Sequence, residues 1–280
     1  MITSRNRCSD LRRTIGFVNN LRPAPSEVLV TADGCSDDTA RMLQEEFPDV
    51  ILTINDVGRG SVASRAAMME TTSCDLILAL DDDSHPEQSN TLAFLTDQFK
   101  TNSRLAIATF PQRSDEYPES LTCVNFGEAR PIRSFPNSGA CLRVSTYREL
   151  AGFEPLFFHM YEEPDYALQC VANGWEAIFF PDITIRHYWT PNERSEIRNH
   201  HLHARNEFWS TLMRCPFPYA FAIIIWRVFS QARYAFRRGP SWFIREPIWW
   251  FHAIRGVRPA ISRRRPVSWE GYLSWISIPD

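Results

Sequence analysis

Up to about residue 200, short apolar runs alternate with segments in which apolar residues recur every three or four positions. The apolar runs cover residues 27–31, 50–54, 75–80, 105–109 and 177–180. The helical patterns between them cover residues 36–47, 61–70, 91–99 and 166–173. Runs that are apolar at nearly every position are typical of strands buried on both faces. The alternation therefore predicts an α/β fold with a Rossmann-like, mostly parallel sheet and helices on both of its faces.

Beyond residue 200, tryptophan, phenylalanine and arginine dominate, and helical spacing continues. We therefore predict an α/β domain over residues 1–200 and a helical, aromatic and arginine-rich extension over residues 201–280. No run reaches the roughly 18 apolar residues expected of a membrane-spanning helix. The N-terminus turns polar at once, and the seven cysteines are scattered, so we expect a cytoplasmic protein with reduced thiols.

The extension is strongly basic, although the whole chain has a formal net charge of −3 that gives no indication of nucleic acid binding. Between Arg198 and Arg265 there are thirteen arginines against two acids, Glu207 and Glu246, a local balance of 13 − 2 = +11. This asymmetry indicates a polyanionic partner such as phospholipid. The alternative is that the arginines coat the surface of a helical cap.

Aromatic residues sharpen the first of these two hypotheses. Trp242, Trp249 and Trp250 precede the run Arg263-Arg264-Arg265. Aromatic side chains at the interface and arginines near anionic headgroups favour peripheral contact with the cytoplasmic face of a membrane. In the alternative, these aromatic side chains form the core of the cap.

Three adjacent carboxylates, Asp81, Asp82 and Asp83, directly follow the apolar run 75–80. Burying them unpaired would be very costly. Because ligands of parallel sheets bind at the carboxyl ends of strands, the cluster favours Mg²⁺ or Mn²⁺ bridging to phosphates. The alternative is an acidic turn that caps the next helix. His187, which follows a strand-like segment, joins the hypothesis as a candidate metal ligand.

A glycine-rich turn offers a different function. Residues 58–63 fit the pattern G-x-G-x-x-A, which follows a strand and opens a helix, and Asp81 comes about 20 residues later. This pattern is typical of dinucleotide binding. However, a complete strand–helix unit precedes it, and a nicotinamide ribose needs one acid rather than three. An NAD(P)-dependent oxidoreductase that uses the Gly58-Arg59-Gly60 turn is therefore kept as the alternative.

The segment Glu162-Glu163-Pro164-Asp165 forms another acidic cluster after an aromatic run. Transfer of a group to a hydroxyl needs a general base, and neighbouring carboxylates and aromatic surface would raise the pKa of such a base. The alternative is an acidic first turn of the helix predicted at residues 166–173, stabilised by the helix dipole.

Several segments match, in chain order, the motifs of one family. Residues 2–7 are similar to its T-x-x-N-R turn, residues 30–39 to its V-D-D/N-G-S-x-D-x-T signature, and residues 55–66 to its N-x-G…A-R-N segment. Residues 80–83 match D-x-D, residues 137–154 resemble S-G-A-x-x-x-x-R…G-G-F-D, and residues 162–165 stand where the family has E-D-x-D. Over residues 2–206 the chain thus resembles family 2 of the inverting glycosyltransferases, which have the GT-A fold.

The resemblance implies a role for each matching residue. Binding of the nucleotide sugar is assigned to Thr3, Arg5, Asp33, Gly58, Arg65, Asp81 and Asp82. The metal ion, Mn²⁺ or Mg²⁺, is assigned to Asp83 and His187. The catalytic acids are Glu162, Glu163 and Asp165, with Glu163 as the base. Glu163 stands where the family has aspartate, and Pro164 is a further departure from the pattern.

The function implied is that of bacterial rhamnosyl-, galactofuranosyl- and hexosyltransferases of polysaccharide and cell-envelope biosynthesis. They move a sugar from a nucleoside diphosphate to a hydroxyl group of a glycan or a lipid-linked precursor, with inversion of configuration. A catalytically inactive protein that binds sugar nucleotides or glycans on the same fold is a further alternative. The intact carboxylates at positions 81–83 and 162–165 argue against it.

Overall fold

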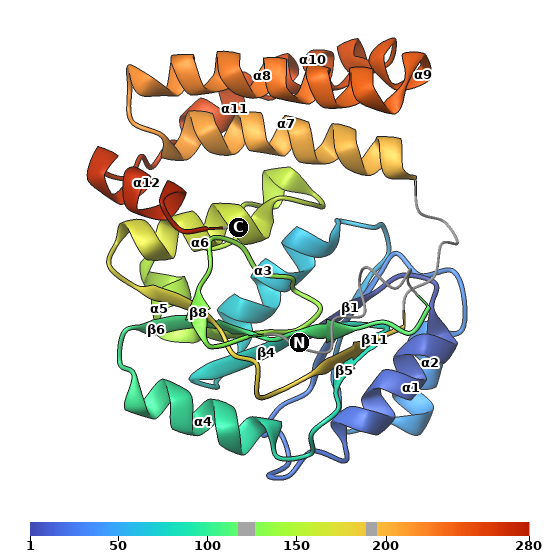
Figure 1. Ribbon diagram of the computed structural model, residues 1–280. Helices are drawn as coiled ribbons and strands as arrows, with labels where there is room; N and C mark the ends of the chain where they lie inside the picture. Colours follow the sequence, from blue (N-terminus) through green and yellow to red (C-terminus); the bar gives the residue numbers. More distant parts are fainter. Residues whose placement is uncertain (117–126, 189–194, 280) are drawn as a thin grey trace.

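The computed structural model describes residues 1–116, 127–188 and 195–279, and its centre is an eight-stranded sheet (Figure 1). The strand order is β3-β2-β1-β4-β9-β6-β10-β8. These strands are β1 (Ile2–Ser4), β2 (Leu29–Asp33), β3 (Ile51–Asn55), β4 (Leu76–Asp81), β6 (Leu105–Thr109), β8 (Arg130–Pro131), β9 (Ala140–Arg143) and β10 (Glu176–Phe179). All run in one direction except β9, which is antiparallel to β4 and β6, and β8, which is antiparallel to β10. The expectation of a mostly parallel sheet is confirmed.

Helices cover both faces of the sheet, as the apolar strands require (Figure 1). One face carries α1 (Cys8–Val18), α2 (Thr39–Glu46) and α4 (Thr91–Thr101), and the other carries α3 (Ser61–Thr71), α5 (Val144–Glu149) and α6 (Glu162–Ala172). The larger core lies on the second face, where Met69, Phe157 and Tyr166 are fully buried. Removing this apolar surface from water is the main stabilisation of the domain.

A small second sheet positions one of the site residues. It contains β5 (Ser84–Pro86), β11 (Ile185–His187) and β7 (Gln112–Arg113), in that order. In the antiparallel pair of β5 and β11, His187 lies opposite Ser84. Because Ser84 directly follows the three aspartates, this register brings His187 next to them from a distant part of the sequence.

The C-terminal residues form a helical layer above α6 (Figure 1). Its helices are α7 (Glu196–Arg214), α8 (Tyr219–Arg238), α9 (Pro240–Phe243), α10 (Glu246–Arg255), α11 (Val257–Ser262) and α12 (Trp269–Ile276). Residue 200, the boundary predicted from composition, lies within α7, which packs against α6 as well as α8, α10 and α11. Trp209 of α7 belongs to the core of the α/β part and donates a hydrogen bond to the Ala253 carbonyl of α10 (2.9 Å).

Among the described residues, no helix is long and apolar enough to cross a membrane.

Candidate functional site

A pocket of about 400 Å³ opens where β1 and β4 end. Eight of the residues predicted to form the site line it: Thr3, Arg65, Asp81, Asp82, Asp83, Glu162, Glu163 and His187. Thr3 and Asp81 lie opposite each other in the neighbouring strands β1 and β4. The carboxyl edge of the sheet therefore gathers these side chains, as expected for a parallel α/β fold.

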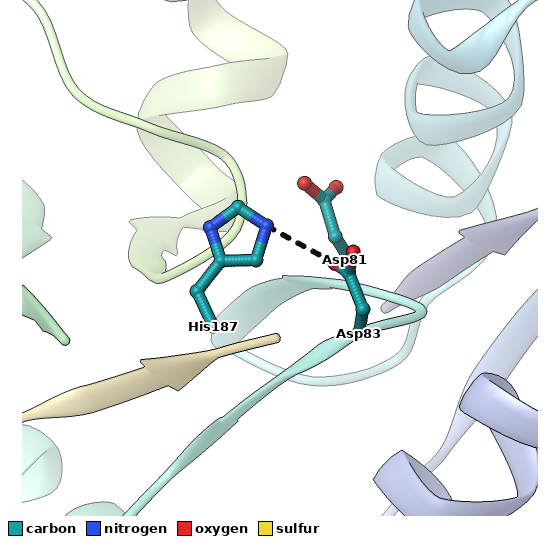
Figure 2. A group of neighbouring side chains, drawn as sticks. All are labelled: Asp81, Asp83 and His187. Atoms are coloured by element: carbon teal, nitrogen blue, oxygen red, sulfur yellow. Dashed lines mark ion pairs between the residues drawn. The ribbon is translucent and has the colours of Figure 1, made fainter. Parts of the chain in front are cut away.

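Asp81, Asp83 and His187 form a group that could hold a metal ion (Figure 2). Each offers one ligand atom, and these atoms all lie within 4.8 Å of one another. His187 Nε2 faces Asp83 Oδ1 at 3.1 Å. Two carboxylates and an imidazole suit Mn²⁺, which accepts both oxygen and nitrogen ligands.

The imidazole of His187 is oriented by a second residue. Its Nδ1 lies 3.0 Å from Gln112 Oε1, and the amide oxygen can only accept a hydrogen bond. This contact at Nδ1 leaves Nε2 facing the carboxylate of Asp83. Metal-binding histidines are commonly oriented in this way, through a hydrogen bond at the second ring nitrogen.

Arg7 neutralises the aspartate cluster. Its guanidinium forms ion pairs with Asp82 Oδ1 at 2.9 Å and with Asp83 Oδ2 at 2.8 Å. Burial works to raise the pKa of Asp83, but His187 and Arg7 hold it below its ordinary value. Burial raises the pKa of Asp82 to about 7 although Arg7 opposes it, and Asp82 also accepts a hydrogen bond from Ser4 Oγ (2.8 Å). The carboxylate of Asp82 thus lines the pocket but is already bound by Arg7 and Ser4.

Arg65 connects the two acidic clusters from α3. This buried guanidinium pairs with Asp81 and lies 3.3 Å from Glu162 Oε1. Glu162 Oε1 also accepts a hydrogen bond from Asn137 Nδ2 (3.3 Å). The charges of Asp81 and Glu162 are therefore compensated by one arginine, which keeps both carboxylates at the pocket without mutual repulsion.

Glu163 lies next to this network, and it forms no ion pair with any arginine in the part of the chain that the structure describes. Removal from water raises the pKa of Glu163 to about 8, and the negative charge of Glu162 adds to the rise, whereas Arg65 opposes it. A carboxylate with such a pKa is a stronger base than an ordinary glutamate near neutral pH.

The irregular loop that directly precedes α6 also lines the pocket, through His159 and Met160. Phe158, Met160 and Tyr161 have φ of 65°, 72° and 73°, a conformation that needs external support. Asn206 of α7 provides it, because its amide donates to the carbonyls of Phe157 (3.1 Å), His159 (2.8 Å) and Met160 (2.8 Å). The C-terminal helical layer thereby fixes the position of pocket residues.

The glycine-rich turn serves a different purpose from dinucleotide binding. Asp33, at the end of β2, accepts hydrogen bonds from the amides of Arg59 (2.9 Å) and Gly60 (2.8 Å). A Cβ at Gly60, whose φ is 91°, would lie 2.2 Å from the Phe158 carbonyl. The amides that would bind a pyrophosphate are thus used by an internal carboxylate, and the glycine allows close packing against the loop.

Three of the expected donor-binding residues, Arg5, Asp33 and Gly58, form their own group beside the pocket. A Cβ at Gly58 would lie 3.3 Å from Arg5 Nη1 and 3.4 Å from the Asp33 carbonyl oxygen. Arg5 follows β1, Asp33 ends β2 and Gly58 follows β3, on the same edge of the sheet as Thr3 and Asp81.

Asp165 lies outside the pocket, in contrast to the expectation that grouped it with Glu162 and Glu163. Its carboxylate is fully buried and pairs with Arg214 of α7, with Arg214 Nη2 at 3.1 Å. It also accepts hydrogen bonds from Ser210 Oγ (2.7 Å) and Gln169 Nε2 (2.8 Å). These partners use its lone pairs, so Asp165 fastens α6 to α7 instead of facing the pocket.

Sequence reasoning missed four residues that complete the site: Arg7, Gln112, Asn137 and His159. Arg7 belongs to the T-x-x-N-R-like turn, so that motif held a signal for it. Asn137 begins the segment that resembles S-G-A, one residue before the matching serine. Gln112 and His159 belong to no motif; only the folded chain brings His159 to the pocket and Gln112 to the ring of His187.

Residues 1–211 match the profile of the glycosyltransferase like family 2. The chain belongs to this family. Membership over three quarters of the chain removes the basis for the oxidoreductase alternative, in agreement with the internal hydrogen bonds of the glycine-rich turn. No curated protein sequence is significantly similar to the chain.

Solved structures of glycosyltransferases share the fold of this family 2 member. A mannosyltransferase from Pyrobaculum calidifontis, in complex with GDP-Man and Mn²⁺, has a TM-score of 0.60 at 14% identity, covering 98% of this chain and 84% of that one. TarS 1–349 of S. aureus in complex with UDP-GlcNAc has a TM-score of 0.64 at 12% identity, with 93% and 80% covered. GalNAc-T7 with UDP, GalNAc and Mn²⁺ has a TM-score of 0.63 at 12% identity; the match covers 77% of this chain and 47% of GalNAc-T7, about half its length.

Proposed function

We propose that this protein is a metal-dependent, inverting glycosyltransferase that moves a sugar from a nucleoside diphosphate to a hydroxyl acceptor. The observation that carries the proposal is one pocket lined by both the group Asp81, Asp83 and His187 and the carboxyl group of Glu163. The solved structures with GDP-Man and Mn²⁺, with UDP-GlcNAc, and with UDP, GalNAc and Mn²⁺ support it. A pocket with both a metal-ligand group and a high-pKa acid supports catalysis over binding alone.

Asp83 and His187 would hold Mn²⁺ or Mg²⁺, with Asp81 as the third member of the group. When bound, the ion supplies positive charge that stabilises the departing diphosphate. Arg65 fixes the carboxylate of Asp81, and Gln112 fixes the ring of His187, so both ligands are oriented before the donor binds.

Asp33, Arg5 and Gly58 would receive the nucleoside part of the donor, with Thr3, Arg65 and Asp82 nearer the sugar. The grouping of Arg5, Asp33 and Gly58 beside the pocket supports this division. A pocket of about 400 Å³ lies within the usual range for small-molecule sites.

Glu163 would remove the proton from the acceptor hydroxyl as its oxygen attacks the anomeric carbon, opposite to the departing diphosphate. This single displacement inverts the configuration. Glu162 is held by Arg65 and Asn137, so Glu163 is the acid left to exchange a proton. Asp165 would have a structural role, because α7 occupies its carboxylate.

The decisive experiment incubates the purified protein with a panel of nucleotide sugars, with and without Mn²⁺, and measures release of the nucleoside diphosphate. We expect turnover of a donor in the presence of the metal only, and its loss in Asp83→Ala with the fold retained. Absence of turnover for every donor, with metal-dependent donor binding intact, would favour the inactive binding protein.

The acceptor is proposed to be a glycan or a lipid-linked precursor at the cytoplasmic face of a membrane, and the surface of the helical layer supports this location. Along α8, Phe221, Ile225, Phe229 and Phe236 recur on one helical face, and each is more than half exposed. Phe236 packs edge-to-face on Phe243 of α9, which continues the apolar surface.

Arginines beside this apolar surface would contact the headgroups of anionic lipids. Arg233 and Arg237 of α8 are exposed beside the apolar face. The run Arg263-Arg264-Arg265, suggested from the sequence as part of the membrane contact, is partly used inside the protein. Arg264 donates to the Cys215 carbonyl (2.7 Å), and Arg263 lies 3.4 Å from Glu154. The proposed membrane contact therefore moves to α8 and α9, where apolar and basic side chains alternate.

A further inference from the structure

A second groove lies between α7 and α10. It measures about 360 Å³ and is mostly apolar, yet three arginines line it: Arg198, Arg205 and Arg245. Arg198, Leu202 and Arg205 share one face of α7, since they recur every three or four residues along it.

The positive charge of the groove is uncompensated. Within the described residues, none of Arg198, Arg205 and Arg245 forms an ion pair, in contrast to Arg214, which is buried together with Asp165. The nearest acid, Glu246, is buried and accepts hydrogen bonds from His200 (2.7 Å) and Trp249 (2.8 Å).

The effect of the missing partner is clearest at Arg205. It is half-buried, and desolvation lowers the pKa of Arg205 to about 10 because no carboxylate opposes the effect. Its guanidinium donates to the Phe157 carbonyl (2.8 Å) and lies over the ring of Trp209. An anion in the groove would compensate this charge through charge-assisted hydrogen bonds.

The apolar lining selects what kind of anion fits. Leu202 of α7 and Ile248 of α10 line the groove, and the buried Trp249 lies beneath its surface. A free phosphate or a nucleotide gains nothing from such a surface, whereas an amphiphile places its chain there and its charged end at the arginines. Ile248 is half exposed, so a chain in the groove can continue out towards the exposed Ile244.

Arg198 connects this groove to the site of the reaction, because it lines both the groove and the catalytic pocket. A molecule whose phosphate lies at the arginines therefore has a route for its next group into the pocket, towards Glu163.

We propose that the groove between α7 and α10 binds the phosphate or diphosphate of a lipid-linked acceptor, with its hydrocarbon chain on Leu202 and Ile248. The proposal rests on the proposed transferase function and names the class of its acceptor. Arg205 and Arg245 would bind the phosphate, and Arg198 would lie where the acceptor enters the catalytic pocket.

The test measures binding of farnesyl diphosphate by titration calorimetry, without metal or donor, so that it is independent of turnover. Arg245→Gln removes a charge from the groove, and Ile248→Glu makes its apolar side acidic. Arg258→Gln is the matched control, since Arg258 is an exposed arginine of α11 that does not line the groove. We expect affinity to fall on the order of tenfold or more in both groove variants, as for a lost charge-assisted hydrogen bond, and to stay unchanged in the control.

Two further ligands separate the chemistry of the head from that of the chain. Inorganic pyrophosphate and farnesol should each bind at least about tenfold more weakly than farnesyl diphosphate. Equal losses in Arg245→Gln and Arg258→Gln would overturn the proposal, because binding would then follow overall charge. Pyrophosphate binding as tightly as farnesyl diphosphate would overturn the lipid assignment. Binding at the groove in a protein that turns over no nucleotide sugar would refute the transferase function and leave the groove standing.

Discussion

His187 Nε2 lies 3.1 Å from Asp83 Oδ1, although 104 positions (187 − 83) separate the two residues in the chain. The contact forms because β11 pairs with β5 directly after the aspartate cluster. Gln112 holds the opposite side of the ring through Nδ1. A carboxylate oxygen and an imidazole nitrogen thus lie side by side in the pocket, where both can bind a divalent cation.

Gln112→Leu should weaken Mn²⁺ binding about 10- to 100-fold, because the ring of His187 loses the hydrogen bond that fixes its orientation. The fold should be retained, since Gln112 lies on a short strand at the pocket. Calorimetric titration with Mn²⁺ measures the effect. Gln98→Leu on α4, on the opposite face of the sheet, is the matched control and should bind the ion as the parent protein does. Unchanged affinity in Gln112→Leu would show that the ring is oriented without it.

Glu163→Gln should retain donor binding and lose transfer by on the order of 10²–10⁴-fold, the usual contribution of a general base. In the parent protein, transfer should rise with pH up to about 8, because the carboxylate must be ionised to accept a proton and its pKa is raised to about 8. A pH profile of kcat/KM checks this. A flat profile between pH 6 and 8 would contradict the assignment.

Glu163→Gln should also change how the stability of the protein depends on pH. Glu163 keeps its proton up to about pH 8 when folded but releases it above its ordinary value of 4.5 when unfolded. The folded state therefore binds more protons across this window, and its stability decreases as the pH rises from 4.5 to 8. Glu163→Gln removes the effect, so its melting temperature relative to the parent protein should increase over that range. Thermal unfolding at several pH values measures it.

Asp165→Asn should destabilise the protein by about 3–5 kcal/mol, because it leaves the buried charge of Arg214 without its partner. Urea unfolding measures the loss. The matched control is Asp38→Asn, which breaks an exposed ion pair with Arg41 and should cost less than about 1 kcal/mol. If Asp165→Asn instead kept full stability and lost all transfer, Asp165 would be catalytic and the structural assignment would fail.

Ile225→Gln combined with Phe229→Gln should reduce binding to anionic liposomes, because both side chains are exposed on the apolar face of α8. Co-sedimentation with phosphatidylglycerol vesicles and with neutral vesicles measures this. Ile51→Gln, an exposed apolar residue of β3, is the control and should pellet like the parent protein. Salt at about 1 M should release most of the parent protein, since the Debye length falls to about 3 Å. Equal, negligible pelleting in every case would mean that the arginines only coat a soluble cap.

The sequence by itself determined the α/β architecture and the place of the first acidic cluster. Strand and helix periodicity are local properties, because each follows from side chains a few residues apart. A buried strand that ends in Asp81-Asp82-Asp83 must deliver these carboxylates to the edge of the sheet. The same reasoning found Glu162 and Glu163, which begin a helix whose pattern is equally local.

Only the tertiary structure decided which of these acids share a site. Asp165 is two residues from Glu163, yet one lies at the pocket and the other is paired with Arg214, because α7 packs against that part of α6. Likewise, Arg7 contacts the aspartate cluster and Gln112 contacts His187 only because the fold brings these distant segments together. Ion pairs and hydrogen bonds of this kind depend on atoms brought together from distant segments, and no periodicity along the chain encodes that distance.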